Sequence, residues 1–157
     1  MKVLSFDPSS VDTGWAILEE KNTERGIKLI KSGSIKPDKS LDLGKRLLVL
    51  RKQITDVVKA NYPIDVIVCE DQFSGKNAKT LMVLREFTAI IRLVATENEL
   101  PFFLYPPATV KKAVTDNGKA SKADVQKTVL EKYDPEEADN TNITDAIAVG
   151  LTHYKKQ

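Results

Sequence analysis

The sequence predicts an α/β protein built on a five-stranded mixed sheet, with three antiparallel strands followed by two parallel ones and helices on its flanks. Apolar runs of strand length open the chain and recur at residues 66–69 and 101–105. Long segments with apolar residues at helical spacing separate these runs, as in crossover connections between parallel strands. No repeat, linker or low-complexity segment divides the chain, so we expect a single domain over residues 1–157.

The first three predicted strands follow one another closely. Residues 3–6 are a mainly apolar run that delivers Asp7 to its end, and residues 8–10, Pro-Ser-Ser, predict a turn. A second run, residues 13–18, follows at hairpin distance. Residues 26–35 alternate apolar and polar side chains, which is typical of an outer antiparallel strand.

Two long helices and two more strands come next. Apolar residues at helical spacing predict one helix over residues 43–58 and another that ends near Asn98. An apolar run follows each helix. Residues 66–69 lead to Glu70, and residues 101–105 form the fifth strand.

Three shorter helices complete the predicted order. Pro106-Pro107 starts a helix that runs through Val114. Ser121, with Asp124 three residues later, is typical of a helix N-terminus. The last helix begins near Thr141 and runs into the basic tail.

The composition is that of a soluble globular protein, with 41% hydrophobic and 29% charged residues. The only cysteine, Cys69, lies in an apolar run, where we expect a buried small side chain. Because one cysteine forms no disulfide within the chain, a reducing compartment fits. No run has the length of a membrane span or the pattern of a signal peptide, so we expect a cytoplasmic protein that is not bound to a membrane.

The net charge of +2 is small, but its distribution is uneven. Residues 105–133 hold six lysines against three acids, and residues 74–92 hold four basic residues against one acid. Residues 134–145 hold five acids and no base. This separation fits basic surfaces for phosphates beside an acidic metal site, and it also fits ordinary solvated faces.

Carboxylates recur at the ends of predicted elements. Asp7 ends the first strand, Glu70 ends the fourth, and Asp145 lies near the start of the last helix, three residues after Asn142. Asp7 alone would also suit a turn. Carboxylates that are widely spaced in sequence and held on rigid elements are what a divalent metal site needs, since hard cations take oxygen ligands.

Four stretches carry a resemblance to a known family: FDPSSVDTGWAIL, VCEDQFSGKNAKTL, YPPATVKKAVTDNGKASKADVQ and NITDAIAVGLTHY. In order, spacing and length the chain resembles the RuvC-type Holliday junction resolvases, which have a ribonuclease H-like fold. The resemblance implies a dimeric, metal-dependent endonuclease that hydrolyses phosphodiesters in four-way junctions and related branched DNA. Nothing in the sequence indicates a branch-migration partner.

The resemblance also implies the ligands of two Mg²⁺ ions, or of Mn²⁺ in their place. Asp7, Glu70 and Asp145 match three acids of the family. The fourth position is usually Asp, or His in some relatives, and here it is Asn142. An amide oxygen can ligate a cation but adds no charge, so one ion is expected to bind weakly. Asn142 would equally suit a helix cap.

Other matched positions are expected to contact DNA. The resemblance places Lys122 near the scissile phosphate and Lys111 as a second cation, whereas solvated helix lysines are the ordinary alternative. Phe73 matches an aromatic residue that stacks on a base at the junction centre; the alternative is a ring tucked under its own turn. His153 is expected to be structural. The predicted DNA-binding residues are Phe73, Lys76, Asn77, Lys111, Lys112 and Lys119.

Two further functions fit the same fold. A junction-binding protein would keep the fold while Asn142 weakens or abolishes cleavage. A nuclease for RNA–DNA hybrids or RNA would use the same acids, although the lysine-rich residues 105–133 and the turn around Phe73 favour branched DNA.

Overall fold

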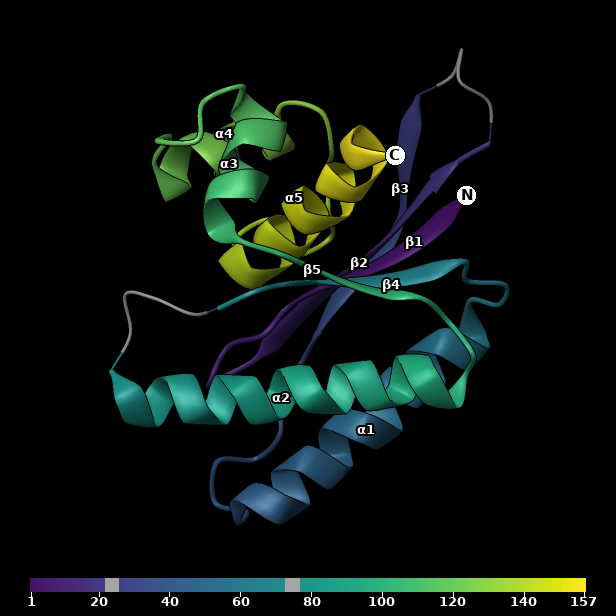
Figure 1. The fold of residues 1–157 in the computed structure, drawn as a ribbon, viewed down its shortest axis with the longest axis vertical. Coiled ribbons are helices and arrows are strands. Elements are labelled where there is room, and N and C mark those ends of the chain that lie inside the picture. The colour runs from purple at the N-terminus through teal and green to yellow at the C-terminus, as the bar shows by residue number, and fades with distance from the viewer. Residues whose placement is uncertain (22–25, 73–76) are drawn as a thin grey trace.

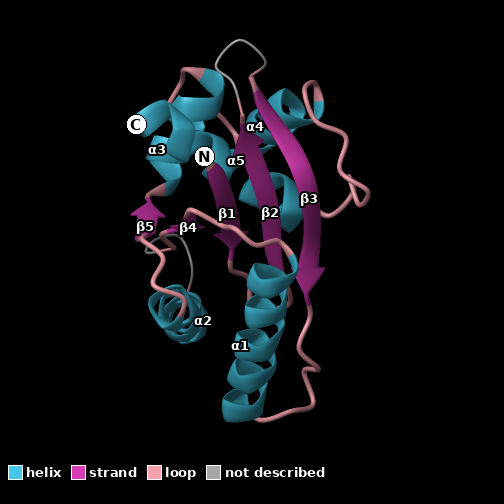
Figure 2. Cartoon of the chain, turned by 90° about the vertical axis from the view of Figure 1, so that its right-hand side faces the viewer, coloured by secondary structure: helices cyan, strands magenta, loops and turns pink. Residues whose placement is uncertain are grey.

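The computed structural model describes residues 1–21, 26–72 and 77–157, and it confirms the predicted mixed sheet (Figures 1 and 2). The sheet order is β3-β2-β1-β4-β5, so the two strands that carry predicted acids lie side by side at its centre. β1 pairs antiparallel with β2, and β2 pairs antiparallel with β3. β4 is parallel to both β1 and β5. The strand bounds are Lys2–Asp7, Thr13–Glu20, Ile27–Ile35, Val66–Glu70 and Phe102–Tyr105 for β1 to β5.

The helices form a layer on each side of the sheet. α1 and α2 cover one face, and α3, α4 and α5 cover the other (Figure 1). The predicted starts are confirmed, including the capping box in which Ser121 and Asp124 satisfy each other's backbone N–H groups at α4. The helix bounds are Leu43–Ala60, Ala78–Glu97, Pro107–Thr115, Lys122–Leu130 and Thr141–Lys156 for α1 to α5.

The start of α5 differs from one expectation. Its N-cap is Asn140, whose side-chain oxygen accepts a hydrogen bond from the backbone N–H of Asn142 at 3.0 Å. The alternative that Asn142 caps the helix is therefore wrong. Asn142 already lies inside the first turn, and its side chain is available for other contacts.

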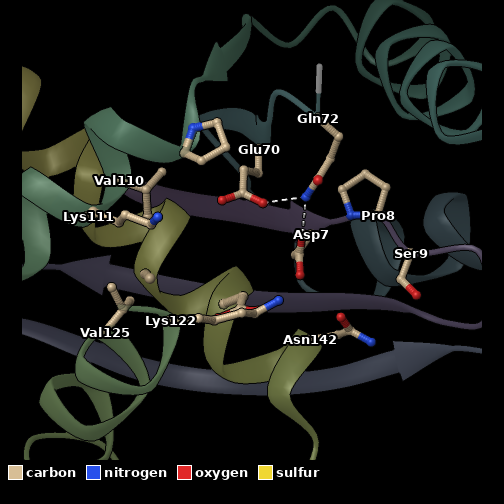
Figure 3. A pocket seen from close by; sticks show the side chains of 13 residues that line it. Asp7, Pro8, Ser9, Glu70, Gln72, Val110, Lys111, Lys122, Val125 and Asn142 are labelled. Carbon is tan, nitrogen blue, oxygen red and sulfur yellow. Dashed lines mark hydrogen bonds and ion pairs between the residues drawn. The ribbon is translucent and has the colours of Figure 1, made fainter. Parts of the chain in front are cut away.

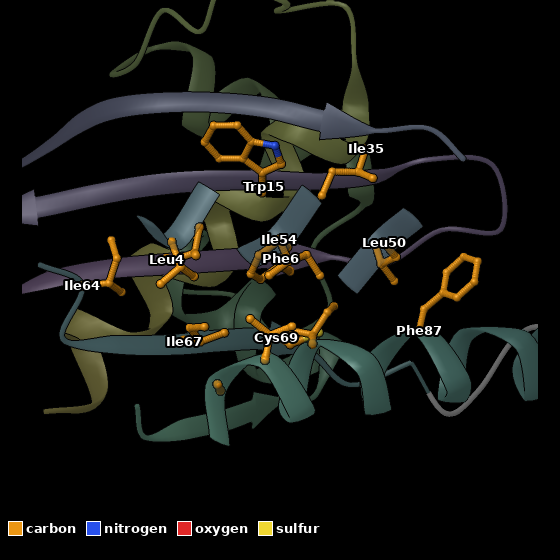
Figure 4. Packing of buried hydrophobic residues seen from close by; sticks show 14 of the residues in the cluster. Leu4, Phe6, Trp15, Ile35, Leu50, Ile54, Ile64, Ile67, Cys69 and Phe87 are labelled. Atoms are coloured by element: carbon orange, nitrogen blue, oxygen red, sulfur yellow. The ribbon is translucent and has the colours of Figure 1, made fainter. Parts of the chain in front are cut away.

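The alternation along β1 creates two separate cores. Leu4 and Phe6 point to the side of α1 and α2, where they join a cluster of large apolar residues (Figure 4). Val3 belongs to the cluster beneath α5. Because side chains alternate between the faces of a strand, Ser5 and Asp7 share the side of Val3. Asp7 is therefore directed to the face that α5 covers.

Close packing seats α5 on the sheet. Ser5 Oγ donates a hydrogen bond to the carbonyl oxygen of Ala146 at 2.6 Å. A Cβ at Gly14 would lie 2.1 Å from the carbonyl oxygen of Asn142, and one at Gly150 would lie 2.3 Å from Leu18 Cδ1. The absence of a side chain at these positions allows the helix backbone to approach β2 and β1 closely.

Two smaller expectations are confirmed. Cys69 is buried in the apolar core on the α1 and α2 side. His153 is buried and its Nδ1 lies 2.7 Å from the Tyr105 hydroxyl, so it joins α5 to β5 as a structural residue. Within the residues described, none of the helices combines the length and apolar character needed to cross a membrane.

Candidate active site

Asp7 and Glu70 leave neighbouring strands at the same edge of the sheet. Phe6 of β1 is paired with Cys69 of β4 in a parallel register, so the next residue of each strand is one of these two acids. The alternation places Glu70 on the side of Val66 and Val68, which pack beneath α5. Both carboxylates thus belong to the α5 face of the sheet.

Asp145 comes from the helix above them. It lies in the buried part of α5, beside Ala146, whose carbonyl is bound by Ser5. The three acids line one pocket of about 260 Å³ (Figure 3). Its walls come from β1, β4, α3, α4 and α5, and its lining residues are Asp7, Pro8, Ser9, Glu70, Gln72, Pro107, Val110, Lys111, Lys122, Val125, Asn142, Asp145 and Ala148.

The pocket concentrates negative charge. Asp7 is only 2% exposed, and its pKa is raised well above the usual 3.8 by burial and then by repulsion from Glu70 and Asp145. Burial also raises the pKa of Asp145, although its ion pair with Lys122 opposes that rise. Additional positive charge would therefore stabilise the ionised form of this cluster.

Lys122 is the cation that faces these acids from the start of α4. Its Nζ lies 2.9 Å from Asp145 Oδ2. Burial lowers the pKa of Lys122, but the hydrogen bond and attraction to Asp145, with further attraction to Asp7 and Glu70, raise it overall. Lys122 consequently stays protonated beside the pocket. Lys111 of α3 also lines the pocket.

Gln72 is a pocket residue that the sequence analysis did not identify. Its Nε2 donates hydrogen bonds to Asp7 Oδ1 at 3.0 Å and to Glu70 Oε2 (Figure 3). The sequence did contain a signal for it. A residue two positions after Glu70 on an extended backbone points to the same side, toward the same neighbours.

The amide of Gln72 contacts one oxygen each of Asp7 and Glu70, and the ammonium of Lys122 contacts one oxygen of Asp145. In this arrangement, no group of three or more His, Cys, Asp and Glu side chains among the described residues is disposed to hold a metal ion. The donor set nevertheless fits one, because three carboxylates and an amide share the lining of one pocket.

Asn142 also lines the pocket, and its partner is another residue that the sequence analysis missed. Its Nδ2 donates a hydrogen bond to Oδ1 of Asp12, which lies in the segment between β1 and β2. Asn140 Nδ2 donates to the other oxygen of Asp12 at 3.0 Å. Asp12 also lines a separate pocket, together with Asp139.

Three further predicted DNA contacts are exposed residues. Lys112 and Lys119 are exposed at the surface, outside the residues described as lining it. Asn77 caps α2, where its Oδ1 accepts a hydrogen bond from the backbone N–H of Thr80 at 2.9 Å. The predictions for Phe73 and Lys76 fall on positions outside the described residues.

Comparisons with known proteins agree on one family. The model of the family described as "Crossover junction endodeoxyribonuclease RuvC" matches residues 3–153. The protein of that name from Aliarcobacter butzleri is 36% identical over 157 residues, with 99% of each chain covered. Its counterpart from Caldicellulosiruptor saccharolyticus is 34% identical over 154 residues, covering 98% of this chain and 92% of that one.

A solved structure shows the same fold. It is Thermus thermophilus RuvC in complex with a Holliday junction substrate, which is 22% identical and superposes with a TM-score of 0.87. The match covers 98% of this chain and 93% of the Thermus chain.

Proposed function

The chain belongs to the RuvC family of crossover junction endodeoxyribonucleases, and from this membership we propose that it hydrolyses phosphodiester bonds in Holliday junctions and related branched DNA during recombination and repair. The observation that carries the proposal is the pocket in which β1, β4 and α5 each place one carboxylate. Residues 1–157 would act as one nuclease domain, because both cores are built on a single sheet.

Asp7, Glu70 and Asp145 are the proposed ligands of two divalent ions, with the side-chain oxygen of Asn142 as a fourth donor. Mg²⁺ fits the all-oxygen donor set. When bound, such ions supply the positive charge that activates an attacking water and stabilises the leaving 3′ oxygen. We expect one ion to bind weakly and Mn²⁺ to support cleavage better than Mg²⁺, because Asn142 contributes no charge.

Lys122 is the proposed catalytic cation of the chain itself. It now neutralises Asp145 across 2.9 Å, and about two thirds of its side chain is exposed, so it can also meet a phosphate at the pocket mouth. A cation there would offset the charge that develops on the phosphate in the transition state. Gln72 would hold the carboxylates of Asp7 and Glu70 in fixed positions through its amide nitrogen.

The DNA would lie across the basic surface around the pocket. Lys111 at its lining and the exposed Lys112 and Lys119 are the proposed phosphate contacts. Asn77, exposed at the start of α2, is a further proposed contact. Phe73 and Lys76 complete the proposed set, with Phe73 stacking on an unpaired base at the junction centre.

We also propose that the protein is a homodimer, because a junction with two symmetric scissile strands calls for two active sites related by a twofold axis. The outer face of α2 supports this assembly. It exposes Met82 and Leu93, and a shallow groove beside Leu93 is lined by Arg85, Thr88, Ala89, Arg92, Leu93 and Thr96. Light scattering should give the dimer mass, and Leu93→Asp should lower it.

A cytoplasmic location follows from the proposed DNA substrate.

The test is cleavage of an end-labelled four-way junction in Mg²⁺ or Mn²⁺. We expect paired nicks, and we expect Glu70→Gln to bind the same junction without cutting it. Three-way, flap and RNA–DNA hybrid substrates of matched sequence measure specificity. Tight junction binding without nicking in either metal would favour the junction-binding alternative that Asn142 suggests. Preferred cutting of the hybrid would overturn the substrate assignment.

A further inference from the structure

Asp12 is a buried carboxylate beside the proposed metal site that the mechanism above does not use. Only 6% of the residue is exposed. Its Oδ1 accepts a hydrogen bond from Asn142 Nδ2, and its Oδ2 accepts one from Asn140 Nδ2 at 3.0 Å. Both partners are thus amides at the start of α5, about 130 residues further along the chain. A buried acid with two such partners fixes the direction of both side chains.

The first consequence concerns which end of the Asn142 amide faces the pocket. An ionised carboxylate only accepts hydrogen bonds, so each amide must present its nitrogen to Asp12. With its nitrogen held there, Asn142 directs its oxygen away from Asp12. In Figure 3 that oxygen lies on the side of Asp7. Asp12 therefore selects the orientation in which Asn142 can act as an oxygen donor.

The second consequence concerns rigidity. Asn140 uses its nitrogen for Asp12 and its oxygen for the backbone N–H of Asn142, so the cap and the orienting contact belong to one network. The backbone of Asn142 is fixed as well, because its carbonyl packs where a side chain at Gly14 would be. Both the backbone and the side chain of Asn142 are thus held by the start of β2 and the segment before it.

The third consequence concerns charge. The position held by Asn142 is neutral, but its amide is hydrogen-bonded to a carboxylate. A carboxylate that accepts a hydrogen bond from a ligand polarises that ligand and makes its donor atom more basic. Asp12, which accepts the hydrogen bond from Asn142, in this way carries the negative charge that Asn142 lacks.

We propose that Asp12 is the positioning residue of the metal site, which holds the Asn142 side-chain oxygen toward the cations and supplies the missing charge from behind. This inference rests on the proposed function, since it assigns Asn142 as a donor. It also bears on Asn142→Asp, because that substitution alone would set two carboxylates in direct contact. A gain in metal affinity is expected only when Asp12 is neutralised at the same time.

The test measures Mn²⁺ binding to the full chain without DNA, from the loss of the free-ion signal in electron paramagnetic resonance. Asp12→Asn keeps the shape and should weaken Mn²⁺ binding by about 10–100-fold, the usual effect of removing an outer partner of a metal ligand. The matched control is Asp139→Asn, which removes the same charge from the neighbouring pocket and has no contact with Asn142 in the described hydrogen bonds. It should change the affinity by less than about twofold.

The double variant Asp12→Asn, Asn142→Asp exchanges the acid and the amide and should restore wild-type affinity or better. Asn142→Asp alone should bind Mn²⁺ more weakly than the double variant, whereas a purely structural role of Asp12 predicts the reverse order. Equal weakening by Asp12→Asn and Asp139→Asn, or unchanged affinity in Asp12→Asn, would overturn the inference. If Asp12→Asn does not fold, the double variant decides alone, and weaker binding than wild type overturns the inference.

The same titration separates this inference from the proposed function. Wild-type protein that binds no Mn²⁺, or binds it equally after Asp7→Asn, contradicts the metal site itself. Binding that requires Asp7 but ignores Asp12 contradicts only the positioning role.

Discussion

The two faces of the central strand β1 differ in chemistry although they alternate residue by residue. Toward α1 and α2, the strand presents Leu4 and Phe6, which are fully buried among large apolar side chains. Toward α5, it presents Val3, Ser5 and Asp7, whose size stays moderate and whose polarity increases along the strand. One face provides stability, and the other accommodates a helix backbone and a carboxylate. Substitutions on the two faces should therefore have opposite consequences.

The largest effect is expected for Asp7→Asn on the α5 face. Cleavage should fall by at least about 10³-fold, equivalent to about 4 kcal/mol of transition-state stabilisation, while junction binding persists through lysine contacts to phosphate. Metal-free protein should at the same time become more stable above the folded-state pKa of Asp7, because a buried charge that two acids repel is removed.

The pH dependence of this stability follows from the raised pKa of Asp7. In metal-free protein the group destabilises the fold progressively as pH rises from 3.8 toward its higher folded-state pKa, and the penalty is complete only above that pKa. Thermal melting measures the change in stability caused by Asp7→Asn, and gel-based nicking measures the change in cleavage. Cleavage above about a tenth of wild type would contradict the assignment of Asp7.

Leu4→Ala should show the reverse behaviour on the other face. Removing a fully buried leucine leaves a cavity and should lower the free energy of unfolding by about 3 kcal/mol. Cleavage by the folded protein should remain close to wild type, because the face that carries the acids is unchanged. Urea unfolding measures the stability of Leu4→Ala, and nicking at low temperature measures its cleavage. The control is Leu48→Ala, which changes a half-exposed leucine and should alter the free energy of unfolding by less than about 0.5 kcal/mol. A large loss of cleavage by folded Leu4→Ala would contradict this prediction, because it would show that the core on the α1 and α2 side also affects the active site.

Gly150→Ala tests whether close packing of α5 is needed for the site. Its Cβ would lie 2.3 Å from Leu18 Cδ1 and 2.9 Å from Ser5 Oγ, so the helix must shift. We expect about 2 kcal/mol of destabilisation and, because Asp145 moves with the helix, a loss of cleavage near 10²-fold, the approximate effect of a 1 Å misplacement. Gly44→Ala in α1 is the milder control, because its Cβ would lie 3.3 Å from Asp42 Oδ1, and it should change stability by less than about 1 kcal/mol. If Gly150→Ala is destabilised but cleaves normally, close packing of α5 against the sheet is not needed for cleavage.

The smallest effect is expected for His153. Burial lowers its pKa below the usual 6.5, so the unfolded chain takes up a proton first as pH falls. His153 therefore contributes stability above pH 6.5 that is lost as pH falls from there toward the folded-state pKa. His153→Asn keeps a hydrogen-bonding group near Tyr105 and should flatten this part of the pH profile. Parallel melting curves of both proteins between pH 5 and about 7.5 measure it, and identical slopes would contradict the prediction.

The sequence was most informative where local patterns decide the structure. Alternation and helical spacing predicted the strands and helices, and the ends of two apolar runs pointed to Asp7 and Glu70. Asp12 had no such signal, because its importance depends on Asn142, which lies 130 residues away. The cap of α5 was also undecidable from sequence. Asn140 and Asn142 have the same chemistry, and only the backbone conformation shows that Asn140 precedes the first turn.

The hydrogen bond from Ser5 to Ala146 joins two residues separated by 141 positions. This separation bears on how the protein is made on the ribosome. Residues 7 and 70 emerge before the helix that carries Asp145. The pocket therefore lacks the wall formed by that helix until the helix has emerged and packed on the sheet. Such long-range closure is a late and comparatively slow folding event. A nascent chain therefore carries incomplete nuclease machinery until the residues of α5 have been synthesised and have packed on the sheet.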